Sequence, residues 1–213
     1  MGAKETLQEI AAEVKTCKKC QLSFSRKNAV PGAGSSNAEI VLIGEGPGFY
    51  ENEQGLPFVG PSGKFLDELL KNAGLSREEV FITNVVKCRP PGNRDPQPEE
   101  LAACEDYLDR QIAAINPRVI VTLGRFSMAK FLSNAKISEI HGQPRWVKGR
   151  YVVPMYHPAA ALHQPKLKSI VEADFALLPQ WLENAKATQP EIVSEETDDT
   201  SSSGEDAIQM SLF

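Results

Sequence analysis

Four cysteines are the residues of this 213-residue chain whose spacing most directly suggests chemistry. Cys17 and Cys20 form a pair separated by two residues, Cys88 follows an apolar run, and Cys104 falls within a long helical pattern. Thiolates spaced in this way can converge on a four-coordinate centre, either a tetrahedral zinc ion or an iron–sulfur cluster. Cys104 could equally be a core residue, because free cysteine is among the most buried residue types. The spacing alone therefore predicts a metal centre without identifying the metal.

A second group of polar residues falls at the ends of predicted strands. Glu45 follows the apolar run 39–43, Asn84 lies near the end of the run 80–86, and His157 follows the run 151–155. Carboxyl ends of parallel strands face one crevice, where open α/β sheets bind ligands. An acid, an amide and an imidazole placed there could read a heterocycle and stabilise an oxyanion. Each residue alone has a plainer interpretation, since an asparagine can cap a turn and a single histidine more often only supports the fold.

The glycine-rich stretch 44–48 directly follows the first of these apolar runs. Its glycines would bring bare backbone to the strand end, although ordinary glycine-rich turns also end strands. Lys64 suggests a phosphate-binding loop, but that motif requires glycine at 58 and serine or threonine at 65, where the chain has Phe58 and Phe65. We therefore expect a ligand pocket here that is not a nucleotide-binding loop.

Apolar runs that alternate with helical patterns predict the scaffold that positions these residues. We expect strands over 39–43, 80–86, 118–123 and 151–155, and helices over 4–15, 62–72, 98–115, 124–132 and 166–182. Ser62 is predicted to cap the second helix, and a turn at Lys148 and Gly149 to join residues 145–147 to the last strand. This alternation predicts an α/β fold whose mostly parallel sheet is covered by helices on both faces.

Composition and charge limit the class of protein. With 41% apolar residues the chain can bury one core, and we expect one domain over residues 1–186. Residues 187–213 carry seven of the 28 acidic residues and neither Lys nor Arg, which predicts a disordered acidic tail. The rest then carries 23 basic and 21 acidic side chains, which is compatible with DNA binding but does not predict it. The absence of a long apolar run or a signal-peptide core predicts a cytoplasmic protein with no membrane span and with reduced cysteines.

Four segments together resemble the family 4 uracil-DNA glycosylases, the iron–sulfur branch of that superfamily. The segments are Gly44-Glu45-Gly46-Pro47-Gly48, 55–60, 84–90 and 157–162, and the resemblance spans about residues 5–184. It implies a three-layer α/β/α fold with a four-stranded, mostly parallel central sheet. It also implies a DNA repair enzyme that flips uracil out of DNA and hydrolyses its N-glycosidic bond, leaving an abasic site for base excision repair.

The resemblance implies which residues would form the uracil pocket. Backbone at Glu45, Gly46 and Pro47 would line it. Phe58 would stack on the extruded base, and Asn84 would hydrogen-bond its pairing edge. A base must leave the stack before any side chain can reach it, which costs a few kcal/mol, so a stacking ring offsets part of that cost.

The chemical step and the opening of the duplex are assigned in the same way. His157 would stabilise the negative charge on the departing uracil. Glu45, or as a second choice Glu51, would orient the attacking water. Ala161 or Leu162 would wedge into the base stack.

The resemblance further implies that the four cysteines hold a 4Fe-4S cluster, and two departures refine the expected chemistry. Some superfamily members carry an aspartate at the position of Gly46, so a direct aspartate base is excluded here. The loop 89–98 has no histidine, unlike that of a relative that traps uracil covalently, so we expect turnover. His163 stands where relatives often have arginine, which would weaken a phosphate contact.

The last five residues resemble the bacterial sliding-clamp-binding pentapeptide. Gln209 would provide a polar contact, and Met210, Leu212 and Phe213 the apolar anchors, with Met210 where leucine is usual. A random apolar chain end is the alternative, because short motifs often match by chance. We expect a monomer. The competing hypothesis for the whole chain is a non-catalytic DNA-binding repair module, which the combination of Glu45, Phe58, Asn84 and His157 disfavours.

Overall fold

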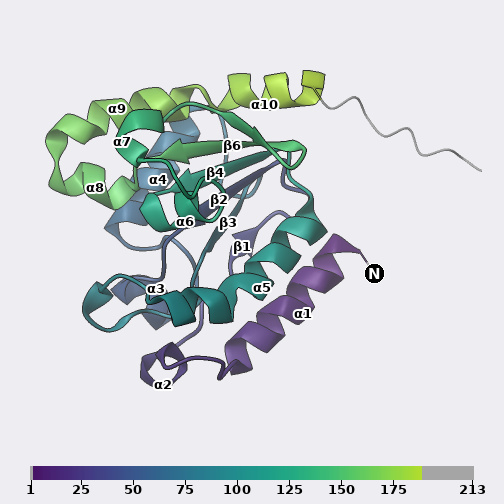
Figure 1. Ribbon diagram of the computed structural model, residues 1–213, viewed down its shortest axis with the longest axis vertical. Coiled ribbons are helices and arrows are strands. Elements are labelled where there is room, and N and C mark those ends of the chain that lie inside the picture. The colour runs from purple at the N-terminus through teal and green to yellow at the C-terminus, as the bar shows by residue number, and fades with distance from the viewer. Residues whose placement is uncertain (1, 189–213) are drawn as a thin grey trace, which may run out of the picture.

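The computed structural model describes residues 2–188, which form one mixed sheet between two layers of helices (Figure 1). The strands are β1 (Ala33–Gly34), β2 (Ile40–Gly44), β3 (Phe81–Asn84), β4 (Val119–Leu123), β5 (Arg145–Val147) and β6 (Arg150–Met155). Their order across the sheet is β1-β3-β2-β4-β6-β5. The predicted four parallel strands form its centre, and the antiparallel edge strands β1 and β5 widen it to six. The expected turn at Lys148 and Gly149 joins β5 to β6.

Helices cover the sheet and connect its strands. They are α1 (Ala3–Thr16), α2 (Leu22–Ser25), α3 (Phe49–Gln54), α4 (Pro61–Asn72), the 3-10 turn η1 (Pro91–Asn93), α5 (Pro98–Ile115), α6 (Arg125–Ala129), α7 (Ile137–Ile140), α8 (Pro158–His163), α9 (Pro165–Ala176) and α10 (Leu178–Thr188). None of the helices in the described residues is both long and apolar enough to span a bilayer.

Three boundaries differ from the sequence-based expectations. The predicted Ser62 cap is wrong, because α4 begins at Pro61 directly after Gly60, and proline is favoured at a first helical position. The helix expected over 166–182 is two helices, α9 and α10, which meet at Leu177. The strand expected over 80–86 is shorter, because β3 ends at Asn84. Helix α10 ends at Thr188, two residues into the predicted tail, whose remainder lies outside the described residues.

Alternate residues of each central strand point to opposite helical layers. In β2, Ile40 and Leu42 belong to the cluster packed against α4, α8, α9 and α10, whereas Val41 and Ile43 face α5 and α6. All four side chains are at most 2% exposed. Fully burying such a side chain contributes roughly 1.5–3 kcal/mol, so both faces of the sheet stabilise the fold.

The strand order places a topological switch point at β2. The chain pairs β2 with β3 on one side and with β4 on the other, so the connections that leave β2 and β4 run in opposite directions. A crevice forms at the carboxyl ends of strands at such a point. Glycines 44 and 46, Asn84 and His157 all lie at this edge.

Candidate active site

A pocket of ≈210 Å³ lies at the carboxyl edge of the sheet. Its lining comes from the loop after β2, helix α3, the segment that leads into α4, the first turn of α4, the end of β3, η1 and the start of α8. The lining residues are Gly46, Gly48, Glu51, Phe58, Ser62, Asn84, Asn93, His157 and Ala159. The structure therefore brings together Gly46, Phe58, Asn84 and His157, as the sequence predicts.

Phe58 occupies a left-handed backbone conformation, with φ 51°, that a bulky residue rarely adopts. Glycines make room for it: a Cβ on Gly63 would lie 1.9 Å from the Phe58 carbonyl oxygen, and a Cβ on Gly44 would lie 2.8 Å from its ring. The ring stacks on His157 with centroids 5.5 Å apart and planes 23° apart. An aromatic face is thereby held at the pocket in a conformation that the neighbouring glycines permit.

Asn84 is the last residue of β3 and is 1% exposed. Its side-chain oxygen is buried and has no hydrogen-bond partner within residues 2–188. A Cβ on Gly44 would lie 2.4 Å from that oxygen, so only glycine fits beside it. An unpaired buried acceptor costs about 1–3 kcal/mol, and a ligand N–H in the pocket would remove that cost.

His157 is held as a neutral imidazole. Burial lowers its pKa to about 4, against a smaller opposing effect of the Glu51 carboxylate. The backbone N–H of Ala159 donates to Nδ1 over 3.1 Å, so the ring proton resides on Nε2. That arrangement leaves Nε2–H as a directed donor at neutral pH.

Glu51 holds the residues that follow Phe58 in place. Its carboxylate accepts hydrogen bonds from the backbone N–H groups of Gly48 (3.1 Å), Val59 (2.9 Å) and Gly60 (2.9 Å). The side chain is buried, and these bonds join the start of α3 to the residues that follow Phe58. Glu51 thus lines the pocket with both oxygens already engaged.

Comparison with known proteins shows which family the chain belongs to. A model of the uracil DNA glycosylase superfamily matches residues 31–182. The chain belongs to this superfamily. It is 50% identical over 181 residues to the type-4 uracil-DNA glycosylase of Archaeoglobus fulgidus, a match covering 80% of this chain and 90% of the relative. The corresponding values for the type-4 enzyme of Thermotoga maritima are 46% over 180 residues, 82% and 94%.

A type-5 uracil-DNA glycosylase of Thermus thermophilus is more distant. It is 35% identical over 149 residues, covering 60% of this chain and 68% of the relative. Membership of the superfamily, with greater similarity to these type-4 enzymes, confirms the predicted resemblance to the family 4 branch.

Glu45 and Pro47 flank the pocket residue Gly46 but are not themselves among the residues that line the pocket. Glu45 is half-buried, and burial raises the pKa of its carboxyl group, as does the nearby Asp95, while Arg125 opposes the shift. Pro47 is buried in the same turn. At Gly46, a Cβ would lie 2.8 Å from a methyl group of Val86, so the turn packs closely against the segment after β3.

Asn93 is a pocket residue that the sequence-based reasoning missed. It lies in η1 with a left-handed φ of 55°, and its side-chain oxygen accepts a hydrogen bond from Arg89 Nε over 2.8 Å. Ser62 and Ala159 also line the pocket. A lone asparagine in a proline-rich loop has no periodicity that would have marked it as functional.

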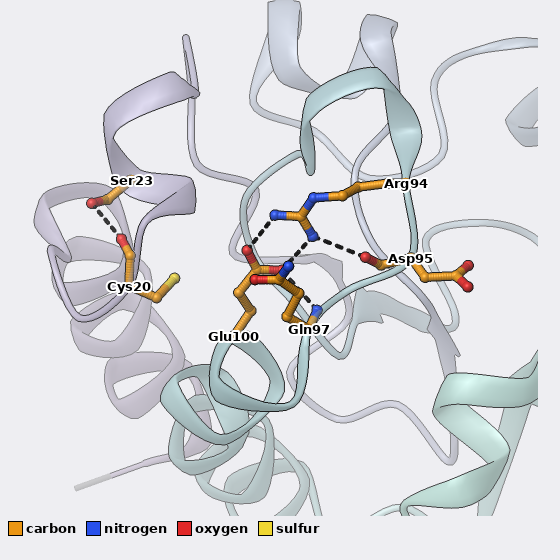
Figure 2. Close-up of polar contacts among 6 residues, drawn as sticks. All are labelled: Cys20, Ser23, Arg94, Asp95, Gln97 and Glu100. Atoms are coloured by element: carbon orange, nitrogen blue, oxygen red, sulfur yellow. Dashed lines mark hydrogen bonds and ion pairs between the residues drawn. The ribbon is translucent and has the colours of Figure 1, made fainter.

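An ion pair between half-exposed Arg94 and buried Glu100 closes the loop that carries Asn93 (Figure 2). Arg94 donates from Nη1 to Glu100 Oε2 over 2.9 Å and from Nη2 to Oε1 over 2.6 Å. The backbone N–H of Gln97 also donates to Glu100 Oε2 over 2.8 Å at the start of α5. Because Glu100 is 1% exposed, this bidentate pair fixes the loop firmly against the helix.

The four cysteines are free thiols that line one small cavity between α1, α2, the segment after β3 and α5. Arg26 Nη1 donates to Cys88 Sγ over 3.1 Å, and the backbone N–H of Lys19 donates to Cys17 Sγ over 3.4 Å. Burial raises the pKa of Cys88, and raises that of Cys104 to about 11. Buried thiols of this kind become thiolates when a bound metal supplies positive charge.

The chemistry of the cysteine donors can be compared with that of a metal centre. Within residues 2–188, no group of three or more His, Cys, Asp or Glu side chains is arranged to hold a single metal ion. Four thiols and their N–H donors around one cavity are nevertheless the donor set of an iron–sulfur centre, whose potential is set by such hydrogen bonds. The residues present are therefore compatible with an iron–sulfur cluster.

The two candidate wedge residues lie on α8 in different environments. Leu162 is 46% exposed, whereas Ala161 is 4% exposed and belongs to the core cluster. An apolar side chain must be accessible to enter a base stack, so Leu162 is the better placed of the two.

Proposed function

We propose that this protein hydrolyses the N-glycosidic bond of deoxyuridine in DNA, releasing uracil and leaving an abasic site. The observation that carries the proposal is the pocket where Phe58, Asn84 and His157 meet in a chain of the uracil-DNA glycosylase superfamily. The type-4 relatives favour this activity over a non-catalytic DNA-binding module.

Recognition of the base rests on Phe58 and Asn84. The flipped uracil stacks on the Phe58 ring, which compensates for lost stacking in the duplex. Asn84 offers an acceptor and a donor, which match the N3–H and O4 of uracil. Its unpartnered side-chain oxygen supports this role, because N3–H would satisfy it.

Bond cleavage rests on His157. As the bond between C1′ and N1 breaks, its electron pair passes to uracil, and negative charge spreads to the O2 atom. A hydrogen bond from Nε2–H strengthens as that charge grows, and the neutral ring already has its proton there. No separate acid is required.

Water then adds to C1′ of the cation-like sugar and loses a proton. We assign its orientation to Glu45, which follows β2 next to the pocket, with Glu51 as the second choice, because Glu51 lines the pocket but already accepts three backbone N–H bonds. The raised pKa of Glu45 suits a carboxylate that takes up a proton during the reaction. Asn93, at the pocket wall, is a second polar group within the site.

We further propose that Cys17, Cys20, Cys88 and Cys104 hold a 4Fe-4S cluster. The four thiols around one cavity and the Arg26 bond to Cys88 support the assignment. The cluster would supply structural cross-linking only, because hydrolysis of a glycosidic bond transfers no electron. DNA is the proposed macromolecular substrate, with Leu162 as the wedge.

The sliding clamp remains a proposed partner of the chain end. Gln209, Met210, Leu212 and Phe213 lie outside the described residues, so the proposal rests on the sequence motif alone. Deleting residues 209–213 should abolish co-elution with the purified bacterial clamp and leave excision from a short oligonucleotide unchanged. Equal clamp binding by both forms, or by neither, would reject it. A monomeric state and a cytoplasmic location also stay predictions.

The glycosylase proposal is tested with an oligonucleotide containing one uracil, incubated with the protein and then treated with alkali. Strand cleavage at the uracil position is expected, and the thymine-containing oligonucleotide should stay intact. His157→Ala should slow excision much more than it weakens DNA binding, because its bond forms chiefly in the transition state. Equal losses would show that His157 only positions the substrate.

A further inference from the structure

Lys87 is a fully buried lysine, 1% exposed, that lies between the pocket and the cysteines. It lies three residues after Asn84 and directly before Cys88. Its ammonium donates to Thr83 Oγ1 (2.7 Å), the Asn84 carbonyl (2.9 Å) and Gln111 Oε1 (2.7 Å). All three acceptors are neutral oxygens. Within residues 2–188 no carboxylate pairs with this side chain, so an ion pair does not explain a buried lysine here.

The acceptors of Lys87 belong to a closed polar network. Thr83 Oγ1 and Gln111 Nε2 each donate to the Pro31 carbonyl, over 3.1 and 2.7 Å. The ammonium thereby joins the end of β3 to α5 and to the segment before β1. A buried network in which every member is satisfied rigidifies the elements it connects.

On the pocket side, Lys87 holds the backbone of the residue that reads the base. Its hydrogen bond fixes the Asn84 carbonyl, and the next N–H, that of Val85, donates to the Gly44 carbonyl over 3.0 Å. The orientation of the Asn84 Cα–Cβ bond is therefore set from both sides. Its side chain lies beside Gly44, in the space that the missing Cβ leaves open, and lines the pocket.

On the cysteine side, Lys87 lines the cavity formed by the four thiols. The same lining includes Cys104, which lies on α5 two turns before Gln111. Metal-bound thiolates would supply the negative charge that the ammonium lacks among its direct partners.

We propose that Lys87 is a positioning residue for uracil recognition: it holds the end of β3 so that the Asn84 amide faces the pocket, and it couples that strand end to the cysteine site. The inference rests on the proposed glycosylase function. It predicts that the effect of Lys87 on excision passes through Asn84.

A double-mutant cycle tests this coupling. Single-turnover excision is measured for the wild-type protein, Lys87→Met, Asn84→Ala and the double variant. Lys87→Met should slow excision about 100-fold in the wild-type background, the cost of a small misplacement of a binding group. In the Asn84→Ala background the further loss should be about twofold at most, because the amide through which Lys87 acts is already absent.

Binding provides a second readout that does not depend on turnover. Lys87→Met should lose the preference for an oligonucleotide carrying 2′-fluoro-2′-deoxyuridine over the same oligonucleotide with thymidine, while its affinity for the latter stays unchanged. Visible absorbance per protein monitors the metal centre in each sample. Lys186→Met is the control, since Lys186 on α10 pairs with Glu39 and Glu183 and lines neither the pocket nor the cysteine cavity, and it should excise at the wild-type rate.

Equal fold-losses from Lys87→Met in both backgrounds, or a wild-type rate for Lys87→Met, would overturn the inference. If Lys87→Met does not fold, the isosteric Thr83→Val variant replaces it in the cycle. That variant should show a smaller coupled loss, and an additive loss would overturn the inference equally. Failure of the wild-type protein to excise uracil would instead reject the glycosylase proposal itself.

Discussion

At the scale of single residues, the pocket assigns base reading and leaving-group stabilisation to different side chains. Asn84 presents a buried oxygen without a partner in the described part of the chain, whereas His157 presents a donor fixed by the Ala159 N–H. The first favours a base with an N–H at the right edge, and the second favours a developing oxyanion. Changing either residue should therefore produce a different kinetic signature.

Asn84→Asp should slow uracil excision strongly. The change replaces the amide donor by an acceptor, so the uracil O4 atom would face an oxygen in a buried site. A loss of about 1–3 kcal/mol corresponds to roughly a 5- to 150-fold slower single-turnover rate. Asn72→Asp, which adds the same charge on the exposed end of α4, is the control. Similar rates for the two variants would show that Asn84 does not read the base.

His157 should make stability depend on pH in a defined direction. The unfolded chain binds a proton at this residue near the ordinary histidine pKa of about 6.5, whereas the folded protein does so only near pH 4. The stabilisation is therefore complete above about pH 6.5 and is lost as the pH falls to about 4. Urea unfolding at a series of pH values should show a steeper acid loss for the wild type than for His157→Gln. His163→Gln, on the exposed side of α8, should follow the wild type, and parallel curves for wild type and His157→Gln would contradict the assignment.

At the scale of elements, the pocket depends on short segments that lie between the regular strands and helices. Helix α3 and the segment after Phe58 are held together by Glu51, and the β3–α5 loop is held by the Arg94–Glu100 pair. The strands set the positions of Asn84 and His157, but these segments bring Phe58 and Asn93 to them. Their anchors are therefore as important to the site as the residues that contact the base.

Glu51→Gln should destabilise the fold and reduce excision together. The amide keeps one acceptor oxygen, so at least one of three backbone N–H groups loses its partner, at a cost of about 1–3 kcal/mol in the free energy of unfolding. Glu53→Gln on the same helix removes only an exposed ion pair with Lys27 and should change stability by less than about 1 kcal/mol. Urea unfolding of the two variants measures the difference. Equal changes in the free energy of unfolding for the two variants would show that Glu51 does not anchor these segments.

The elements that the sequence predicts are those whose pattern is local. Buried apolar runs identify the four parallel strands, and strand ends followed by polar residues identify Asn84 and His157 as neighbours. Strand β1 has two residues and no apolar run, so pairing with β3 alone defines it. Asn93 reaches the pocket through a left-handed turn and an ion pair between residues 94 and 100, and neither leaves a periodic signal.

At the scale of the whole molecule, the pocket and the cysteines share one connection. The chain from β3 to α5 carries Asn84, then Cys88, then Asn93, and reaches Cys104 within the helix. Helix α1, which delivers the chain to Cys17, packs along α5 (Figure 1). A metal centre at the four thiols would thus fasten the N-terminal segment and one wall of the pocket to each other.

Cys17→Ser should lower stability before it changes base selectivity. Loss of one thiolate weakens the proposed cluster, so visible absorbance per protein and the unfolding temperature should both fall. The remaining folded protein should still excise uracil and leave thymine, because Cys17 does not line the pocket. Thr16→Ser, at the exposed end of α1, is the control. A colourless wild-type protein containing zinc would contradict the cluster assignment.

The central claim is hydrolytic release of uracil with turnover, and the intact mass of the DNA tests it most directly. An oligonucleotide with one uracil is incubated with a substoichiometric amount of protein, and both are examined by mass spectrometry. We predict that all of the oligonucleotide loses the mass of uracil and gains that of one water, with an equal amount of free uracil and an unmodified protein. An unchanged oligonucleotide, or a protein that stays covalently joined to DNA after one equivalent, would contradict the account.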